Sequence, residues 1–470
     1  MVNFWDFSIW GTLLLFAVLF GSLLAGNALK KGVPFLRSSL IPTSVLGGSI
    51  ILIVEAIFKA IAGYSFFEAR FFGEDPTSSL EIITYHALAL GFIASTLKSS
   101  KGKMTGKRAE EIFNTGVTTV ATYLLQGVFG LVITIVATLV VKDFFAAAGV
   151  LLPFGYGQGT GQALNYGNIY ENDFGFIGGR SFGLTIAALG FLSASFGGVI
   201  HLNVMKRRGK LPMEKKQETF TAEDVQAENE IPMQESVDKL TIQVALIAIT
   251  YVIAYLFMVL LGNLLPGMRS TIYGFNFLLG VLAATLVKAL IKLLKKAKLV
   301  KKDYTNSFLL TRTSNFFFDI MVVAGVAAIR LDVLERYWGI MLILGAVGLV
   351  ITYIYNRIVA RTLFKDYPEE QFLAMYGMLT GTASTGIILL REVDGNFETP
   401  AADNLVYQNF PAIVFGFPML LLATLAPKQP YLTLGIFVAF FIAMNIILFR
   451  SQIFRCRSKK KNQYRTDRHG

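Results

Sequence analysis

The stretch Leu152–Asn165 reads LPFGYGQGTGQALN and lies between long apolar segments. Its glycines fall on alternate positions: Gly155, Gly157, Gly159 and Gly161. Glycine and proline both disfavour a regular helix, and the stretch is too short to cross a bilayer twice. It therefore predicts a re-entrant segment, over about residues 144–168, that enters a membrane and returns to the same side.

A second Gly-rich stretch lies far away in the chain, at Tyr376–Leu390, and reads YGMLTGTASTGIILL. It predicts a second re-entrant segment over about residues 371–391. Non-helical backbone is tolerated at membrane depth only where protein or a water-filled cavity surrounds it. We therefore expect the fold to hold the two broken segments face to face inside a membrane.

The composition and the apolar runs predict a polytopic, all-α membrane protein. Hydrophobic residues make up 54% of the chain and charged residues only 16%, whereas soluble domains average about a quarter charged. Apolar runs of the length that spans a bilayer recur along the chain. The predicted spans are about 8–27, 42–62, 82–97, 113–141, 182–204, 240–261, 272–294, 308–329, 340–360, 405–425 and 431–449.

The basic residues indicate the orientation of the chain. The net charge is +12, and its main basic clusters are Lys98–Arg108, Lys206–Lys210, Lys292–Lys302 and the C-terminal tail. Basic clusters that recur in every second loop, and therefore on one side of the membrane, are typical of the positive-inside rule, not of nucleic-acid binding. We expect a multi-pass protein of the cell membrane (inner or plasma membrane), with its N-terminus outside and its C-terminus cytoplasmic.

Cysteine and histidine are too sparse to build a metal centre. Cys456 is the only cysteine, so no disulfide can form within the chain. The histidines are His86, His201 and His469, and their scatter argues against a zinc site or a histidine proton relay.

The order of spans and broken segments predicts an internal repeat. Each half has four spans, a broken segment and one more span, and an odd number of spans puts the halves in opposite orientations. GTGQALNYGNIYENDF at 159–174 also aligns weakly with GTASTGIILLREVDGNF at 381–397. Interrupted segments at matching positions of inverted halves mark the binding site of secondary transporters. The predicted divisions are a first repeat at 1–205, a cytoplasmic linker at 206–239, a second repeat at 240–427, and an extra span with a basic tail at 428–470.

The broken segments supply the candidate binding groups. A helix break frees N–H groups that suit a carboxylate, and C=O groups that, with hydroxyls, suit Na⁺. The candidates for substrate or ion binding are Gly157, Gln158, Gly159, Thr160, Gly161 and Gln162 in the first segment, and Gly381, Thr382, Ser384 and Thr385 in the second. Thr160, Thr382 and Ser384 are the expected Na⁺ ligands.

Two charged residues complete the candidate site. Asp319 lies within the eighth predicted span, where a carboxylate is costly and usually faces a pathway or a partner. It is either an Na⁺ ligand or coupling carboxylate, or a structural partner of an arginine such as Arg312. Arg180, before the fifth span, either binds a substrate carboxylate in bidentate fashion or anchors the helix at the interface.

Four motifs carry a family resemblance: IPTSVLGG at 41–48, YGQGTGQA at 156–163, DFGF at 173–176 and GTASTG at 381–386. With these motifs the chain resembles the bacterial sodium/glutamate symporters over most of residues 8 to 427. The resemblance implies two inverted five-span repeats with re-entrant loops, Na⁺-coupled glutamate uptake and a homodimer. Gln158 stands where family members tend to have histidine, and GTAST at 381–385 replaces a GATPT-like run, so the expected substrates extend beyond glutamate.

These observations predict a secondary active transporter that couples Na⁺ to the uptake of glutamate or a related small carboxylate or amino acid. The alternative is a cation- or proton-coupled transporter of other organic anions, such as hydroxycarboxylates, with the same fold. The chain has no Walker motif and no catalytic His/Cys/Ser constellation, so neither a pump nor an enzyme is expected. The expected partners are the substrate, sodium and the bilayer, with no cofactor.

Overall fold

The computed structural model describes residues 7–38, 41–64, 66, 76–98, 105–209, 225, 230–233, 237–266, 269–274, 276–299, 302–330, 337–394 and 399–452. Within these residues the fold is helical, and eleven helices are long and apolar enough to cross a membrane. Each falls on one of the eleven predicted spans. This confirms the prediction of a polytopic α-helical membrane protein.

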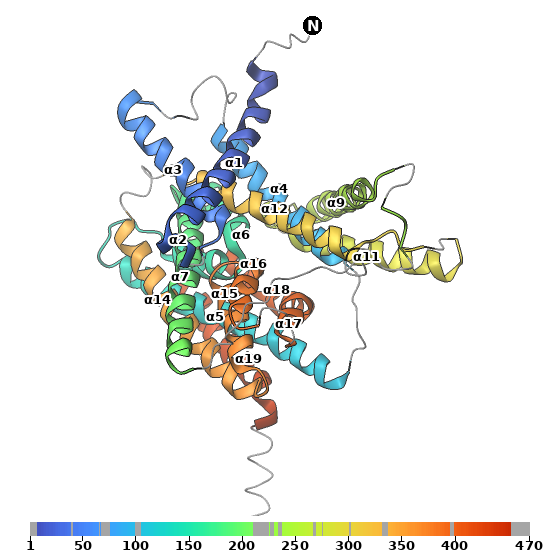
Figure 1. Ribbon diagram of the computed structural model, residues 1–470. Coiled ribbons are helices and arrows are strands. Elements are labelled where there is room, and N and C mark those ends of the chain that lie inside the picture. Colours follow the sequence, from blue (N-terminus) through green and yellow to red (C-terminus); the bar gives the residue numbers. More distant parts are fainter. Residues whose placement is uncertain are drawn as a thin grey trace, which may run out of the picture.

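The helices form two groups that draw on both halves of the chain. The first, the α4/α12 group, contains α1 (Phe7–Gly32), α2 (Pro34–Ser38), α3 (Thr43–Ala62), α4 (Pro76–Leu97), α9 (Lys239–Leu264), α10 (Arg269–Gly274), α11 (Asn276–Lys296) and α12 (Ser307–Ala327). Its centre is the packing of α4 against α12, with α3 on α12 and α11 on α4. In Figure 1, α9 and α11 extend to the right of the remaining helices.

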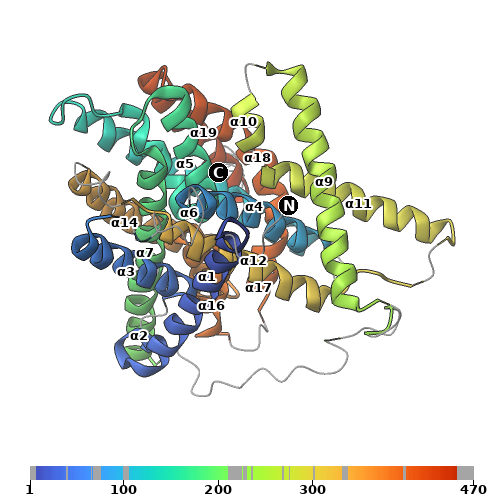
Figure 2. The ribbon, with the colours of Figure 1, turned by 90° about the horizontal axis from the view of Figure 1, so that it is seen from above.

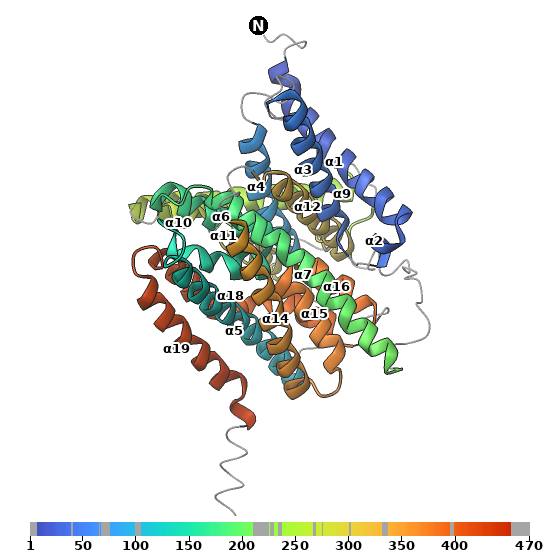
Figure 3. The ribbon, with the colours of Figure 1, turned by 90° about the vertical axis from the view of Figure 1, so that its left-hand side faces the viewer.

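The second, the α5/α14 group, contains the glycine-rich segments. Its members are α5 (Gly106–Ala137), η3 (Ala146–Val150), α6 (Leu151–Phe174), α7 (Gly179–Arg207), α14 (Trp338–Leu363), α15 (Pro368–Thr380), α16 (Ala383–Arg391), α17 (Ala401–Tyr407), α18 (Asn409–Leu425) and α19 (Pro430–Leu448). Figure 3 shows α5, α14 and α19 below α1, α3 and α12, and Figure 2 shows α9 and α11 on the side away from α14.

Local sequence signals determine where several helices begin. Thr105 accepts a hydrogen bond from the backbone N–H of Arg108 at the start of α5. Asn306 does the same for Leu309 at the start of α12. Such N-caps satisfy backbone donors that the helix leaves free, and each contributes about 1 kcal/mol.

The outward faces of the helices are apolar. Exposed side chains include Ile53 on α3, Leu256 on α9, Leu286 on α11, Ile354 on α14 and Ile442 on α19. Apolar surface of this extent, spread over many long helices, suits lipid rather than water. The exposed surface thus agrees with the helix lengths in identifying a multi-pass membrane protein.

The regular helix of the tenth span, residues 401–425, is interrupted once. Helix α17 ends at Tyr407 and α18 begins at Asn409, with Gln408 between them. Pro411 lacks an N–H and cannot donate to the carbonyl of Tyr407 four residues earlier, so the regular helix is interrupted there. The interruption places the Gln408 side chain at a joint between helices.

A close backbone approach joins η3 to α5. A Cβ atom on Gly149 would overlap the carbonyl oxygen of Gly130, so the two backbones must separate to admit any side chain. We expect Gly149→Ala to lower the free energy of unfolding by about 1–3 kcal/mol, as overpacking does. Thermal unfolding of the purified protein in detergent measures this. Gly435→Ala on α19 is the control, because no atom lies within 4 Å of the added Cβ; an equal loss in both variants would contradict the packing argument.

Candidate functional site

The first glycine-rich segment is a helix broken at Gly159. The φ and ψ angles of Gly159 are 75° and −170°, a conformation that is essentially restricted to glycine. The chain reverses there, since the rings of Phe154 and Tyr166 stack with centroids 3.9 Å apart. The segments before and after Gly159 therefore form a hairpin, and both are buried.

The second glycine-rich segment is a similar hairpin. Helix α15 ends at Thr380, Gly381 and Thr382 are non-helical, and α16 begins at Ala383. Helix α16 folds back closely against α15, because a Cβ atom on Gly377 would lie 2.7 Å from the Cα atom of Gly386.

The two breaks meet in the interior. A Cβ atom on Gly159 would lie 3.1 Å from Cγ2 of Thr382 and 3.7 Å from the carbonyl oxygen of Gly381. Segments from opposite halves of the chain thus lie face to face at their interruptions.

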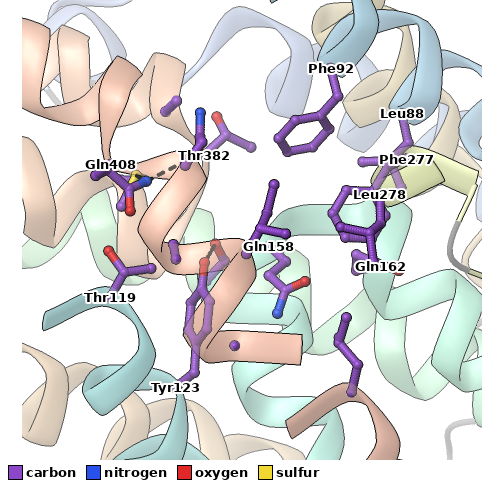
Figure 4. A pocket seen from close by; sticks show the side chains of 18 of the residues that line it. Leu88, Phe92, Thr119, Tyr123, Gln158, Gln162, Phe277, Leu278, Thr382 and Gln408 are labelled. Carbon is purple, nitrogen blue, oxygen red and sulfur yellow. Dashed lines mark hydrogen bonds between the residues drawn. The ribbon is translucent and has the colours of Figure 1, made fainter. Parts of the chain in front are cut away.

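A cavity of about 130 Å³ lies beside this meeting point, between the two helix groups (Figure 4). The α4/α12 group lines it mainly with apolar side chains: Leu88, Phe92, Phe277, Leu278, Phe318 and Met321. The α5/α14 group contributes most of the polar lining: Thr119, Tyr123, Gln158, Gln162, Thr382, Gln408 and Asn409. Among the described residues, no Asp, Glu, Lys, Arg or His side chain lines the cavity.

Four predicted site residues line this cavity: Gly157, Gln158, Gln162 and Thr382. The other predicted residues of the two segments lie behind the lining or beside it. Thr160 is buried, and its hydroxyl donates to the carbonyl of Met321 at 3.2 Å. Gly161 packs on Leu88, and Gly381 packs on Thr385, whose hydroxyl lies 3.4 Å from that of Thr382. Ser384 lies in α16, and its side chain is outside the described part of the structure.

The two predicted charged residues do not line the cavity. Arg180 is held in ion pairs with Glu81 of α4 at 2.7 Å and Glu171 of α6 at 3.0 Å. This arrangement fits the interpretation of Arg180 as a helix anchor. Asp319 is exposed on α12 and hydrogen-bonds to Ser44 of α3. Arg180 thus contacts the end of α6, beyond its break at Gly159, and Asp319 contacts α3, so neither side chain is part of the cavity lining.

Helix α5 contributes site residues that the sequence reasoning missed. The Tyr123 hydroxyl donates to the carbonyl of Gly157 at 3.0 Å, next to the first break. Gln126 donates to the carbonyl of Leu379 at 2.9 Å, next to the second break. A detectable signal was present, because the buried polar residues of this span recur at helical spacing: Thr115, Thr118, Thr119, Thr122 and Gln126.

A cluster of polar side chains ties the start of α15 to α7 and α14. Nε2 of His201 lies 2.9 Å from Glu369, and its Nδ1 lies 2.9 Å from the Tyr353 hydroxyl. Arg357 donates to both carboxylate oxygens of Glu369, and its guanidinium lies over the ring of Phe372. Burial is the largest single influence and raises the pKa of the Glu369 carboxyl, but the hydrogen bonds and charges of Arg357 and His201 together lower it more, so the pKa lies below its ordinary value. Only the tertiary fold brings these residues together.

The geometry describes a small, uncharged cavity at two apposed helix breaks, with amide, hydroxyl and phenol groups on one wall. Such a site can bind a small polar solute through hydrogen bonds. The resemblance to the sodium/glutamate symporters stays a prediction, because no protein-family model matches this chain and a search of the curated proteins found no match.

Proposed function

We propose that this protein is a secondary active transporter that couples Na⁺ to the uptake of glutamate or a related small carboxylate or amino acid. One observation carries the proposal: the two helix breaks meet at Gly159 and Thr382 beside a cavity between two helix groups. Broken helices at the centre of a membrane fold are the usual means by which secondary transporters bind solutes and ions.

The packing of the helices supports two inverted repeats. Helix α1 packs on α3 as α9 packs on α11, and α3 packs on α12 as α11 packs on α4. In the other group, α7 packs on α14 as α18 packs on α5. We infer that α1–α7 and α9–α18 are equivalent units of opposite orientation, and that α19 is an addition that packs on α5.

The residues at the breaks fit the proposed chemistry. Helix α16 begins at the cavity with Thr382 as its N-cap, and the Thr382 side chain makes no capping hydrogen bond to the first amides there. Free amides at a helix N-terminus can donate hydrogen bonds to a solute in the cavity. The Thr160 hydroxyl and the Met321 carbonyl give two oxygen atoms next to the first break, and oxygen ligands suit sodium.

The position of the cavity suggests how access alternates. The cavity lies between the α4/α12 and α5/α14 groups rather than between the two halves of the chain. A shift of one group against the other would therefore expose the site to each side of the membrane in turn. We further propose an outer N-terminus, a cytoplasmic C-terminus and a homodimer in the cell membrane.

Uptake by proteoliposomes tests the proposal. We expect accumulation of labelled amino acid, alanine or glutamate, to require an inward Na⁺ gradient. Thr382→Val is expected to reduce uptake at least about tenfold, whereas Thr362→Val on α14, away from the cavity, is expected to leave it unchanged. Uptake indifferent to Na⁺ would contradict the coupling, and equal uptake by both variants would contradict the site.

One observation favours a proton-coupled organic-anion transporter as the second candidate. His201 and Glu369 form a close pair at the start of α15, the helix that leads to the second break. Uptake of citrate driven by a pH gradient without Na⁺, and abolished in Glu369→Gln, would support this alternative over sodium coupling.

A further inference from the structure

Two glutamine side chains in the cavity each have one buried atom without a hydrogen-bond partner among the described residues: Nε2 of Gln162 and Oε1 of Gln408. The two residues are only 1% and 2% exposed. In Figure 4 they lie on opposite sides of Gln158. Buried polar atoms normally have partners, so this pair indicates groups that a ligand completes.

The surroundings of Gln162 determine which amide atom is free. Nδ2 of Asn165 donates to the carbonyl of Gly274 at 3.1 Å, which orients the Asn165 amide. The same nitrogen donates to Oε1 of Gln162 at 2.9 Å. The free atom of Gln162 is therefore the donor Nε2, which needs an acceptor.

The surroundings of Gln408 leave the other kind of amide atom, the oxygen, without a partner. Its Nε2 donates to the sulfur of Met378 at 3.4 Å and to Oδ1 of Asn409 at 3.1 Å. A thioether sulfur only accepts, so the nitrogen must face Met378. The free atom of Gln408 is therefore the acceptor Oε1, which needs a donor.

We propose that Gln162 and Gln408 orient the transported solute as a donor–acceptor pair, and that the solute is a small amino acid with an uncharged side chain. Gln162 donates to the carboxylate of the substrate and Gln408 accepts from its ammonium group. The two charges of the solute balance each other. A second carboxylate would lie against Leu88, Phe92 and Phe277 with no cationic side chain in the described lining, which is costly.

This inference rests on the proposed function and refines its substrate class. Calorimetric binding to the full-length protein in detergent, with Na⁺ present, tests the inference, and uptake by proteoliposomes tests the transport function. The probes are L-alanine, propionate (which lacks the ammonium group) and L-glutamate. We expect L-alanine to bind at least about tenfold more tightly than either of the others.

Two variants with near-isosteric, apolar side chains separate the roles. Gln408→Met is expected to weaken L-alanine binding roughly tenfold and to leave propionate binding unchanged, because only alanine offers a donor. Gln162→Met is expected to weaken both, because both carry a carboxylate. Gln429→Met, at the exposed N-cap of α19, is the control and should change neither. Thermal unfolding establishes that each variant is folded.

Each outcome decides one of the two proposals. Tighter binding of L-glutamate than of L-alanine, no binding of L-alanine, or an equal loss for alanine and propionate in Gln408→Met would overturn the amide pair. The relative affinities of the wild-type protein for L-alanine, propionate and L-glutamate test the proposal even if a variant does not fold. Binding of L-alanine with the expected selectivity but without uptake would overturn the transport function and leave the amide pair standing.

Discussion

Replacing Gly159 with alanine is expected to reduce the initial rate of uptake at least about tenfold. The variant is expected to remain folded. Gly159 holds a conformation that costs a residue with a Cβ atom about 1–3 kcal/mol, and the new Cβ would press on Thr382. Relief of this strain requires the two breaks to move apart, which changes the site itself. Initial rates of uptake in proteoliposomes measure the effect.

Gly175→Ala is the matched control for this experiment. Gly175 caps the same helix, α6, with a φ of 71°, but its added Cβ would meet open space away from the cavity. It should lose about 1–2 kcal/mol of stability, from its left-handed backbone alone, and keep normal transport. If both variants transported equally well, contact between the breaks would have no role in transport.

Removal of the Arg357 guanidinium is expected to destabilise the protein strongly. Arg357→Ala leaves Glu369 largely buried without its main partner. We expect the free energy of unfolding to fall by about 3 kcal/mol, the lower end of the range for breaking a buried ion pair. Because the pKa of Glu369 is lowered in the fold, this stabilisation is fully present above the ordinary glutamate pKa of about 4.3 and is lost as the pH falls through the lower pKa of the folded state. Thermal unfolding in detergent between about pH 7 and pH 3 measures both effects.

Lys107→Ala on α5 provides the comparison, because it removes an ion pair whose acidic partner lies close to Glu369 in the chain. Lys107 pairs with Asp366, three residues before Glu369, but both side chains are exposed. Exposed ion pairs contribute little to stability, so no measurable change is expected. Unfolding of Arg357→Ala at the same temperature as wild type, or a deficit that persisted unchanged at about pH 3, would contradict this role of the ion pair.

The sequence was sufficient to predict the eleven spans and the positions of both breaks. Span length follows from apolar composition, which is a local property, and glycine conformation is local as well. The tenth span shows the limit of this reasoning. Its strongly apolar composition predicts a continuous helix, but Pro411 interrupts the helix at Gln408. Its effect places Gln408 in the site.

Long-range partners account for the part of the site that sequence could not predict. The sequence allows Arg180 to bind an anion, whereas in the fold Arg180 is paired with Glu81 and Glu171, which lie on separate helices. His201 had no predicted role because its partners come from α14 and α15. Such pairings depend on packing between distant segments, which single-sequence patterns do not encode.

The unequal walls of the cavity have a mechanical consequence. Apart from Ser95, the polar side chains around it belong to the α5/α14 group, and the opposite wall is mainly apolar. Hydrogen bonds would hold a bound solute mainly to the α5/α14 group, whereas the apolar wall of the α4/α12 group makes contacts that have no preferred direction. If the two helix groups move against each other as proposed, the bound solute would therefore move with the broken helices and lose its contacts with the apolar wall.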